Sequence, residues 1–226
     1  MKLKILYLSL FIFVYACNGQ TKKKEMLTQN KNIMIEKFDF IEYEKRVNND
    51  PINGEFYTKP DGTLVEEINS TNPVRWEIPP KPSFVKVYKE FYPNGNMKRE
   101  ETYIGKITKT GISLYYDEKG NITKKVDEDS KFGKIRQKDI LVFLEGKKRI
   151  NIETGEGIFD ERGNFMYNIA YNEETNLWYV TIPQGRPYTA IEMSEIMKNS
   201  IGEPSDWKPF EYVINGTTGE IISSDE

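Results

Sequence analysis

The sequence predicts an α+β protein that consists mainly of antiparallel β-hairpins, followed by a smaller C-terminal part in which helices pack on an antiparallel sheet. Short segments with alternating apolar and polar residues are rich in strand-favouring aromatics, with 14 Tyr, 12 Phe and 3 Trp in 226 residues. Turns that contain glycine or asparagine separate these segments. Two later segments carry apolar residues at helical spacing instead.

The first residues of the chain have the anatomy of an export signal. Lys2 and Lys4 precede residues 5–15, an apolar run of eleven residues that a single serine interrupts. A run of this length is too short to span a bilayer as a mature helix. Residues 1–16 are therefore predicted to be a signal peptide, which ends immediately before Cys17, the only cysteine in the chain.

The tetrad Val14-Tyr15-Ala16-Cys17 resembles the lipobox of bacterial lipoproteins. The resemblance implies that Cys17 is diacylated and becomes the first residue of the mature protein, with residues 17–32 as a flexible tether. Acyl chains contribute about 0.8 kcal/mol per buried methylene, so they would anchor the protein without a transmembrane helix. An ordinary signal peptide with a leftover cysteine and an uncleaved N-terminal helix are the alternatives.

The residues after Cys17 predict a location in the cell envelope. In enterobacterial lipoproteins, an aspartate at the next position signals retention in the inner membrane, and this chain has Asn18 there. The acidic run that serves as a surface-export signal in some Bacteroidota is also missing. The outer membrane, facing the periplasm, is therefore the expected site, with the cell surface as the alternative.

The folded part is predicted to begin near residue 33 with a short helix and a hairpin. Asp39 and Glu42 have the spacing of a capping box, and residues 48–51 end the helix. Residues 55–65 then have the pattern of a hairpin with a Pro-Asp-Gly turn. Four prolines in residues 72–83 predict an irregular connector.

Two similar strand–turn–strand units follow the connector. The first has a strand over residues 84–92 and a turn at Gly95, and the second has residues 114–116 before a turn at Gly120. The two glycines lie 25 residues apart and are expected to supply the positive φ that such turns need.

These units resemble the MORN-variant repeats of the group often labelled YwqK-type antitoxins. The resemblance covers about forty residues, and the matching residues are Phe91, Tyr92, Asn94, Gly95, Tyr103, Gly105, Lys106, Tyr115, Tyr116, Asp117 and Gly120. It implies curved antiparallel hairpins and an antitoxin-like role. A plain antiparallel sheet also accounts for every aromatic residue in this set.

An acidic run at residues 127–129 separates the hairpins from the C-terminal part. It lacks the spaced oxygen ligands of a calcium-binding loop, so a solvated linker is expected. The predicted division is a repeat-hairpin β domain over residues 33–130 and a helix-plus-sheet domain over residues 131–226.

The C-terminal part is predicted to contain two helices and two hairpins. Residues 135–145 form the first helix, with Gly146 as its C-cap, and residues 189–199 form the second. The second helix is expected to bury Ile191, Ile196 and Met197. The hairpins are expected at 165–182 and 210–222.

The end of the chain resembles PepSY-type domains, which are common in secreted bacterial proteins. The matching segments are Trp178-Tyr179-Val180, Tyr212-Val213-Ile214 and Thr218-Gly219-Glu220-Ile221-Ile222. The resemblance implies a small module with a helix on an antiparallel sheet.

Composition excludes several classes of chemistry. The chain has no histidine, so histidine-based catalysis and histidine-ligated zinc are excluded, and lipidation would consume the only thiol. No metal or other cofactor is predicted. Removal of residues 1–16 leaves 30 basic and 35 acidic residues, a net charge of −5, which argues against binding to nucleic acid.

These observations predict a non-enzymatic envelope lipoprotein that binds a protein partner, such as a toxin that it would neutralise as an immunity protein. Aromatic residues are enriched in interface hot spots, and the predicted contacts are Tyr92, Tyr103, Tyr115 and Trp207. A role in the core is the alternative for each of them.

Two other functions remain open at this point. A glycan hydrolase could use two acids on opposed strands, and the acids nearest the hairpins are Glu100, Glu101, Asp117 and Glu118. A structural or inhibitory module of PepSY type could instead pair an edge strand of its C-terminal sheet with an extended peptide.

Overall fold

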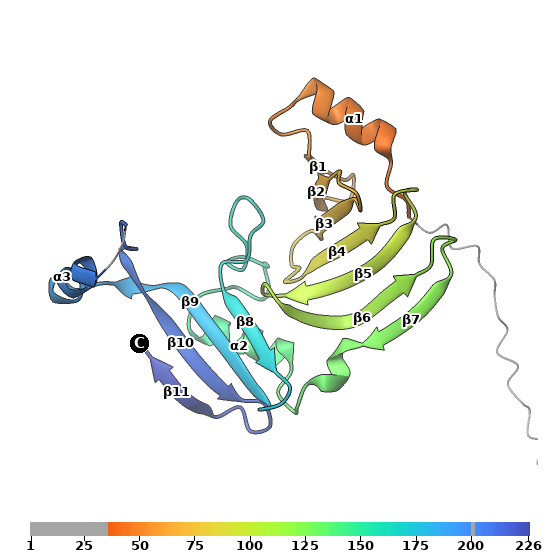
Figure 1. The fold of residues 1–226 in the computed structure, drawn as a ribbon. Helices are drawn as coiled ribbons and strands as arrows, with labels where there is room; N and C mark the ends of the chain where they lie inside the picture. The colour runs from red at the N-terminus through yellow and green to blue at the C-terminus, as the bar shows by residue number, and fades with distance from the viewer. Residues whose placement is uncertain (1–35, 200–201) are drawn as a thin grey trace, which may run out of the picture. The chain divides into compact units, whose positions relative to one another are not determined.

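Antiparallel strands form two sheets, with helices beside them, which confirms the α+β prediction (Figure 1). The computed structural model describes residues 36–199 and 202–226. The predicted signal peptide, Cys17 and the predicted tether lie outside the described residues. No helix in the described part of the chain is long and apolar enough to cross a membrane.

The larger sheet has seven strands in chain order, which are β1 (Phe56–Thr58), β2 (Leu64–Ile68), β3 (Val74–Ile78), β4 (Lys86–Phe91), β5 (Met97–Ile104), β6 (Thr108–Tyr116) and β7 (Ile122–Asp127). The smaller sheet has the order β11-β10-β9-β8, with β8 (Asn168–Asn172), β9 (Leu177–Pro187), β10 (Trp207–Asn215) and β11 (Ile221–Asp225). The helices are α1 (Phe40–Asn49), the short 3₁₀ helix η1 (Glu128–Lys131), α2 (Gln137–Gly146) and α3 (Ala190–Asn199).

Helix α1 begins where the capping pattern predicts. The Asp39 carboxylate accepts a hydrogen bond from the Glu42 N–H at 3.0 Å, which satisfies one of the free donors of the first turn. Tyr43 is buried on the inner side of the helix and packs with Phe38, which in turn contacts Phe91 of β4. The helix is therefore attached to the seven-stranded sheet by an aromatic cluster.

The predicted hairpin turns are also confirmed. Gly95 and Gly120 have φ values of 81° and 87°, in the left-handed region that favours glycine. Each turn is closed by a backbone hydrogen bond to the residue three positions earlier, from Gly95 N–H to Tyr92 O and from Gly120 N–H to Asp117 O.

The predicted connector over residues 72–83 is wrong, because strand β3 lies within it. Residues 74–78 pair in register with β2, and residues 74–77 pair in register with β4. The four prolines of this segment flank the strand and do not interrupt it, so every residue of β3 keeps the N–H that its ladders need.

Two details of the C-terminal helices also differ from prediction. Helix α2 includes Gly146 and has Lys147 as its C-cap, while Lys148 takes the left-handed conformation with φ of 57°. In α3, Ile191 and Met197 are 75% and 65% exposed, so the expected burial of these two side chains is wrong. Helix α3 lies in the connection between β9 and β10, and of the three residues expected to be buried only Ile196 is half-buried.

The main hydrophobic core lies between α2 and the four-stranded sheet. Ile140 and Leu144 of α2 pack in one cluster with Trp178 of β9 and Tyr212 of β10. Ile104, from the end of β5, belongs to the same cluster. The core of the smaller sheet thus includes a residue of the larger one, and residues 35–226 form one compact unit.

The turn between β5 and β6 lies against the edge strand β8. The Thr108 hydroxyl donates to Ile169 O at 3.0 Å and accepts from the Tyr171 N–H at 3.2 Å. Gly105 leaves room for this contact, since a Cβ at this position would lie 2.7 Å from Ile169 O. The edge of β8 is therefore closed by β6.

The close approach at Gly105 predicts an asymmetric effect of two alanine substitutions. Gly105 and Gly111 both have φ of 68°, so either Gly→Ala change should cost roughly 1–2 kcal/mol of backbone strain. Only Gly105→Ala also forces Cβ into Ile169, which should add about 1–3 kcal/mol, because nothing lies within 4 Å of the Cβ position at Gly111. Urea unfolding of both variants measures the difference in unfolding free energy. Equal losses of stability in the two variants would contradict the close approach of Gly105 to Ile169.

Candidate functional site

One face of the seven-stranded sheet presents rows of aromatic and charged side chains. Successive side chains of a strand point to opposite faces, so residues in register share a face. The register aligns Phe56, Glu66, Trp76, Tyr88 and Glu101 across β1 to β5. We call this surface the aromatic face, and it comprises these residues together with Leu64, Ile78, Lys86, Arg99, Tyr103, Lys109 and Tyr115.

The rings at the centre of the aromatic face are held in contact with one another and with cations. The centroid of the Trp76 ring lies 4.8 Å from that of Tyr88 and 5.8 Å from that of Tyr103. The Lys86 ammonium lies 4.9 Å from the Trp76 ring centroid, and the Arg99 guanidinium lies 4.9 Å from that of Tyr88. All these aromatic side chains are half-buried, so part of each ring remains open to solvent.

A buried carboxylate organises the next part of the face. Glu101 has no exposed surface, and it accepts hydrogen bonds from Lys109 Nζ at 2.6 Å, Tyr103 OH at 2.7 Å and Tyr115 OH at 2.8 Å. Burial alone would raise its pKa, but the bonds from Lys109 and the two tyrosines outweigh burial and hold the pKa of the Glu101 carboxyl below its ordinary value. The group is therefore a fixed anion at neutral pH.

The same bonds keep the tyrosine hydroxyls protonated. Burial, together with the hydrogen bond to Glu101, raises the pKa of Tyr103 and that of Tyr115. Both hydroxyls are committed to a single acceptor, which fixes the orientation of the two rings on the face.

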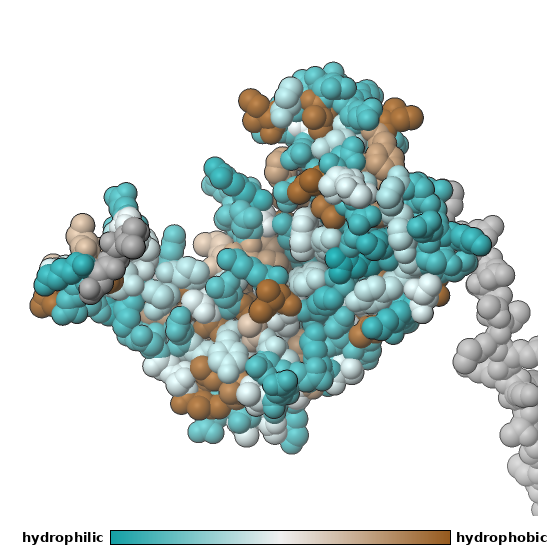
Figure 2. Space-filling model, viewed as in Figure 1, coloured by the Kyte–Doolittle hydropathy of each residue, from teal (hydrophilic) through white to brown (hydrophobic). Residues whose placement is uncertain are grey.

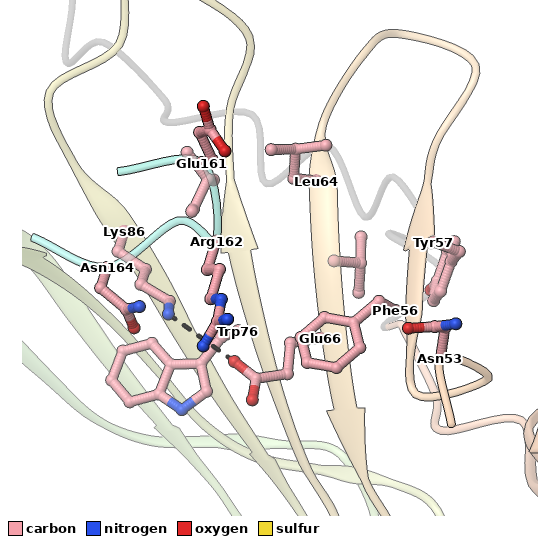
Figure 3. Close-up of a pocket in the computed structure, with 12 residues that line it drawn as sticks. Asn53, Phe56, Tyr57, Leu64, Glu66, Trp76, Lys86, Glu161, Arg162 and Asn164 are labelled. Atoms are coloured by element: carbon pink, nitrogen blue, oxygen red, sulfur yellow. Dashed lines mark ion pairs between the residues drawn. The ribbon is translucent and has the colours of Figure 1, made fainter. Parts of the chain in front are cut away.

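A cavity of about 560 Å³ adjoins the aromatic face at β1 to β4 (Figure 3). Its apolar lining comes from neighbouring strands and includes Phe56, Leu64, Trp76 and Ile78. The turn over residues 160–164 supplies Glu161, Arg162 and Asn164 on the other side, and Asn53 completes the polar lining. This volume falls in the range of small-ligand and anchor-residue pockets.

Lys86 stands in the wall of this cavity with an incomplete set of partners. Its Nζ lies 3.8 Å from Glu66 Oε2, an ion pair without a hydrogen-bond distance (Figure 3). Burial lowers the pKa of Lys86, and the nearby Glu66 offsets this only in part. An additional acceptor from a bound partner would therefore be favourable here.

The side of the molecule shown in Figure 2 is mainly hydrophilic. On the side shown in Figure 2, apolar side chains form small separate patches among polar ones. Exposed apolar residues near the cavity include Phe56 and Leu64, which are 50% and 48% exposed.

The structure brings together only two of the four predicted contact residues. Tyr103 and Tyr115 lie on the aromatic face, where both donate to Glu101. Tyr92 follows β4, and its hydroxyl donates to Tyr116 O at 2.8 Å. Trp207 lies in the other sheet, at the start of β10 opposite Pro187, and is 39% exposed.

The sequence predicts a turn at residues 160–164, but sequence reasoning did not assign this turn, Trp76 or Tyr88 to a functional site. The turn carried a signal, because Asp-Glu-Arg-Gly-Asn at 160–164 repeats the pattern Asp-Glu-Lys-Gly-Asn at 117–121. The two turns are built alike, since each aspartate accepts from the N–H groups two and four residues later. Gly163, with φ of 75°, takes the place of Gly120.

The four acids considered for hydrolysis do not converge. Glu100 points to the face opposite Glu101 and lies 3.9 Å from Lys89. Asp117 accepts hydrogen bonds from Asn121, which together with backbone donors lower its pKa. Glu118 lies exposed in the same turn. In the described residues, no group of three or more acidic, histidine or cysteine side chains could hold a metal ion.

Comparison of the chain with protein-family models, curated proteins and solved structures gave no match.

The buried carboxylate predicts a pH-dependent loss of stability. Glu101→Gln should lower the free energy of unfolding at pH 7 by about 2–3 kcal/mol, because it removes the charge that pairs with Lys109 and replaces one of the two accepting oxygens by an NH2 donor. The folded-state pKa is depressed, so this stabilisation is present above the unfolded value and is lost as pH falls through the folded one. The difference in unfolding free energy between Glu101→Gln and the wild-type protein should therefore become smaller below about pH 4.

The neighbouring acid provides the matched control for this measurement. Glu100→Gln should change the unfolding free energy by less than about 0.5 kcal/mol, since its ion-pair partner among the described residues, Lys89, lies 3.9 Å away. Urea unfolding from pH 3 to pH 7 measures both variants. If the loss of unfolding free energy in Glu101→Gln were the same at every pH, the charge of the Glu101 carboxylate would not be the source of the stabilisation.

Proposed function

We propose that this chain is a non-enzymatic, lipid-anchored envelope protein that binds a protein partner through the aromatic face. The observation that carries the proposal is the continuous set of half-buried rings and paired charges across β1 to β6, next to a cavity. Tryptophan, tyrosine and arginine are the residue types that dominate interface hot spots, and Trp76, Tyr88 and Arg99 lie together here.

The side chains of the aromatic face are already fixed before any partner binds. Arg99 Nε lies 2.6 Å from Glu90 Oε2 and its guanidinium stacks on Tyr88. Immobilising a long side chain on binding costs about 0.5–1.5 kcal/mol, and this cost is reduced where packing has ordered the group already. The face is therefore suited to recognise a complementary protein surface with little loss of conformational entropy.

The kind of partner follows from the resemblance of residues 84–122 to antitoxin repeats. A toxin, neutralised by occlusion of its working surface, is the partner class that this resemblance supports. A carboxylate-based hydrolase is supported less well, because a general acid needs a raised pKa and the pKa values of Glu101 and Asp117 are lowered.

A pair of tyrosines tests the face. A photo-crosslinking amino acid at Tyr88 should capture a specific envelope protein, and Tyr88→Ala should weaken binding of that purified partner by about tenfold or more. Tyr179, on the four-stranded sheet and 39% exposed, is the matched control for both measurements. Equal capture from both positions, or equal affinity of Tyr88→Ala and wild type, would contradict the proposal, provided that circular dichroism shows both variants folded.

The proposed anchor has its own test. Metabolic labelling with a clickable palmitate should mark the wild-type protein and leave Cys17→Ser unmarked, because the chain has no other cysteine. The variant should also leave the membrane fraction or retain its signal peptide. Asn18→Asp is the control, which should keep the label. Unlabelled wild-type protein in the soluble periplasm would overturn the anchor and the envelope assignment that rests on it.

A further inference from the structure

The four edge strands of the two sheets differ in how they are protected. An edge strand presents unpaired N–H and C=O groups, and proteins usually shield it by shortness, by lysines or by a covering segment. Strand β1 has three residues, and β7 carries Lys124 and Lys125. Strand β8 is covered through Thr108. Each of these three edges thus has a recognisable device against further pairing.

Strand β11 has none of these devices. It is the outermost strand of the four-stranded sheet and pairs only with β10 within the described part of the chain (Figure 1). All five of its residues are exposed, and Ile221 and Ile222 are 43% and 55% exposed. It contains neither lysine nor proline. Alternate residues of β11 therefore direct backbone donors and acceptors away from β10 toward open space.

The charges around β11 identify the kind of strand that fits this edge. Glu220 and Glu226 flank the strand, Asp225 is its last residue, and Glu211 of β10 lies directly opposite Asp225 in the register. Like charges in opposed positions of a sheet are destabilising. Lys208 pairs with Asp225 at 2.8 Å and Lys147 pairs with Glu226, which leaves an excess of carboxylates.

A second copy of β11 would add three more carboxylates to this seam. A strand with basic residues at its ends would instead neutralise the carboxylates while its uncharged centre paired with residues 221–224. The charge pattern thus favours a foreign strand over self-association.

We propose that the free edge of β11 is a β-augmentation site for an extended segment of a partner protein, with an uncharged centre and lysine or arginine at its ends. The main-chain ladder would supply the affinity, and the flanking carboxylates would select for basic residues. The site is independent of the aromatic face, which lies on the other sheet.

The test uses the full-length protein in detergent and a short synthetic peptide in which threonine and valine alternate between two terminal lysines. Binding should slow amide hydrogen exchange in β11. A matched peptide with terminal glutamates should bind at least about tenfold more weakly. Backbone N-methylation of the lysine peptide at alternate positions should abolish binding for one set of positions and spare the other, because only alternate N–H groups face β11.

Several outcomes would overturn the proposal. These are equal effects of the two methylation patterns, protection that maps outside β11, absence of binding, or a concentration-dependent dimer that protects β11 without peptide. Tyr88→Ala should bind the lysine peptide as wild type does. This control separates the edge from the aromatic face, so failure of either proposal would leave the other standing.

Discussion

The ion pair between Arg75 and Glu67 is the interaction on which the arrangement of the larger sheet depends. The two residues lie directly opposite each other on β3 and β2, their side chains are 6% and 3% exposed, and their closest atoms lie 2.5 Å apart. Removing one partner of such a buried pair leaves an uncompensated charge at a cost of about 3–5 kcal/mol. Slipping β3 by one residue against β2 would move Arg75 to the opposite face and leave Glu67 without this partner, so the pair specifies the register of these strands. Trp76 neighbours Arg75, and its position on the aromatic face is a consequence of the same register.

The cluster around this pair includes Glu36, the first residue that the structure describes. Glu36 lies beside Arg75 and also accepts from Lys89 Nζ at 2.5 Å. Burial alone would raise the pKa of Glu36. The hydrogen bond and charge of Lys89, together with the charge of Arg75, outweigh burial and lower the pKa of the Glu36 carboxyl. Glu36 therefore lies on the face of the sheet opposite the aromatic face. A partner on the aromatic face would not compete with Glu36 for the same surface.

The sequence was sufficient to predict the fold class, the capped helix α1 and the glycine turns, because each depends on local chemistry. It was insufficient for β3, where the usual pattern is inverted. In Val74–Ile78, the charged residues Arg75 and Glu77 are buried and Trp76 is half-buried on the open face. Partners on β2 and β4, together with Glu36 and Lys59, make such burial of charges favourable, and none of these partners lies in the segment itself. The prediction for α3 was wrong in a different way. Its apolar spacing correctly predicted a helix, but Ile191 is exposed and not buried.

The two sheets differ in where they place their apolar side chains. The smaller sheet buries Trp178 and Tyr212 against α2, so the surface proposed for it is the strand edge of β11. The larger sheet buries Arg75 and Glu67 on one face and holds its rings on the other, where ion pairs and cation–π contacts order the side chains of the proposed recognition surface. Recognition by a side-chain face depends on the identity of the residues, whereas recognition by an edge depends mainly on an extended backbone. The two proposed surfaces would therefore select partners by different physical rules.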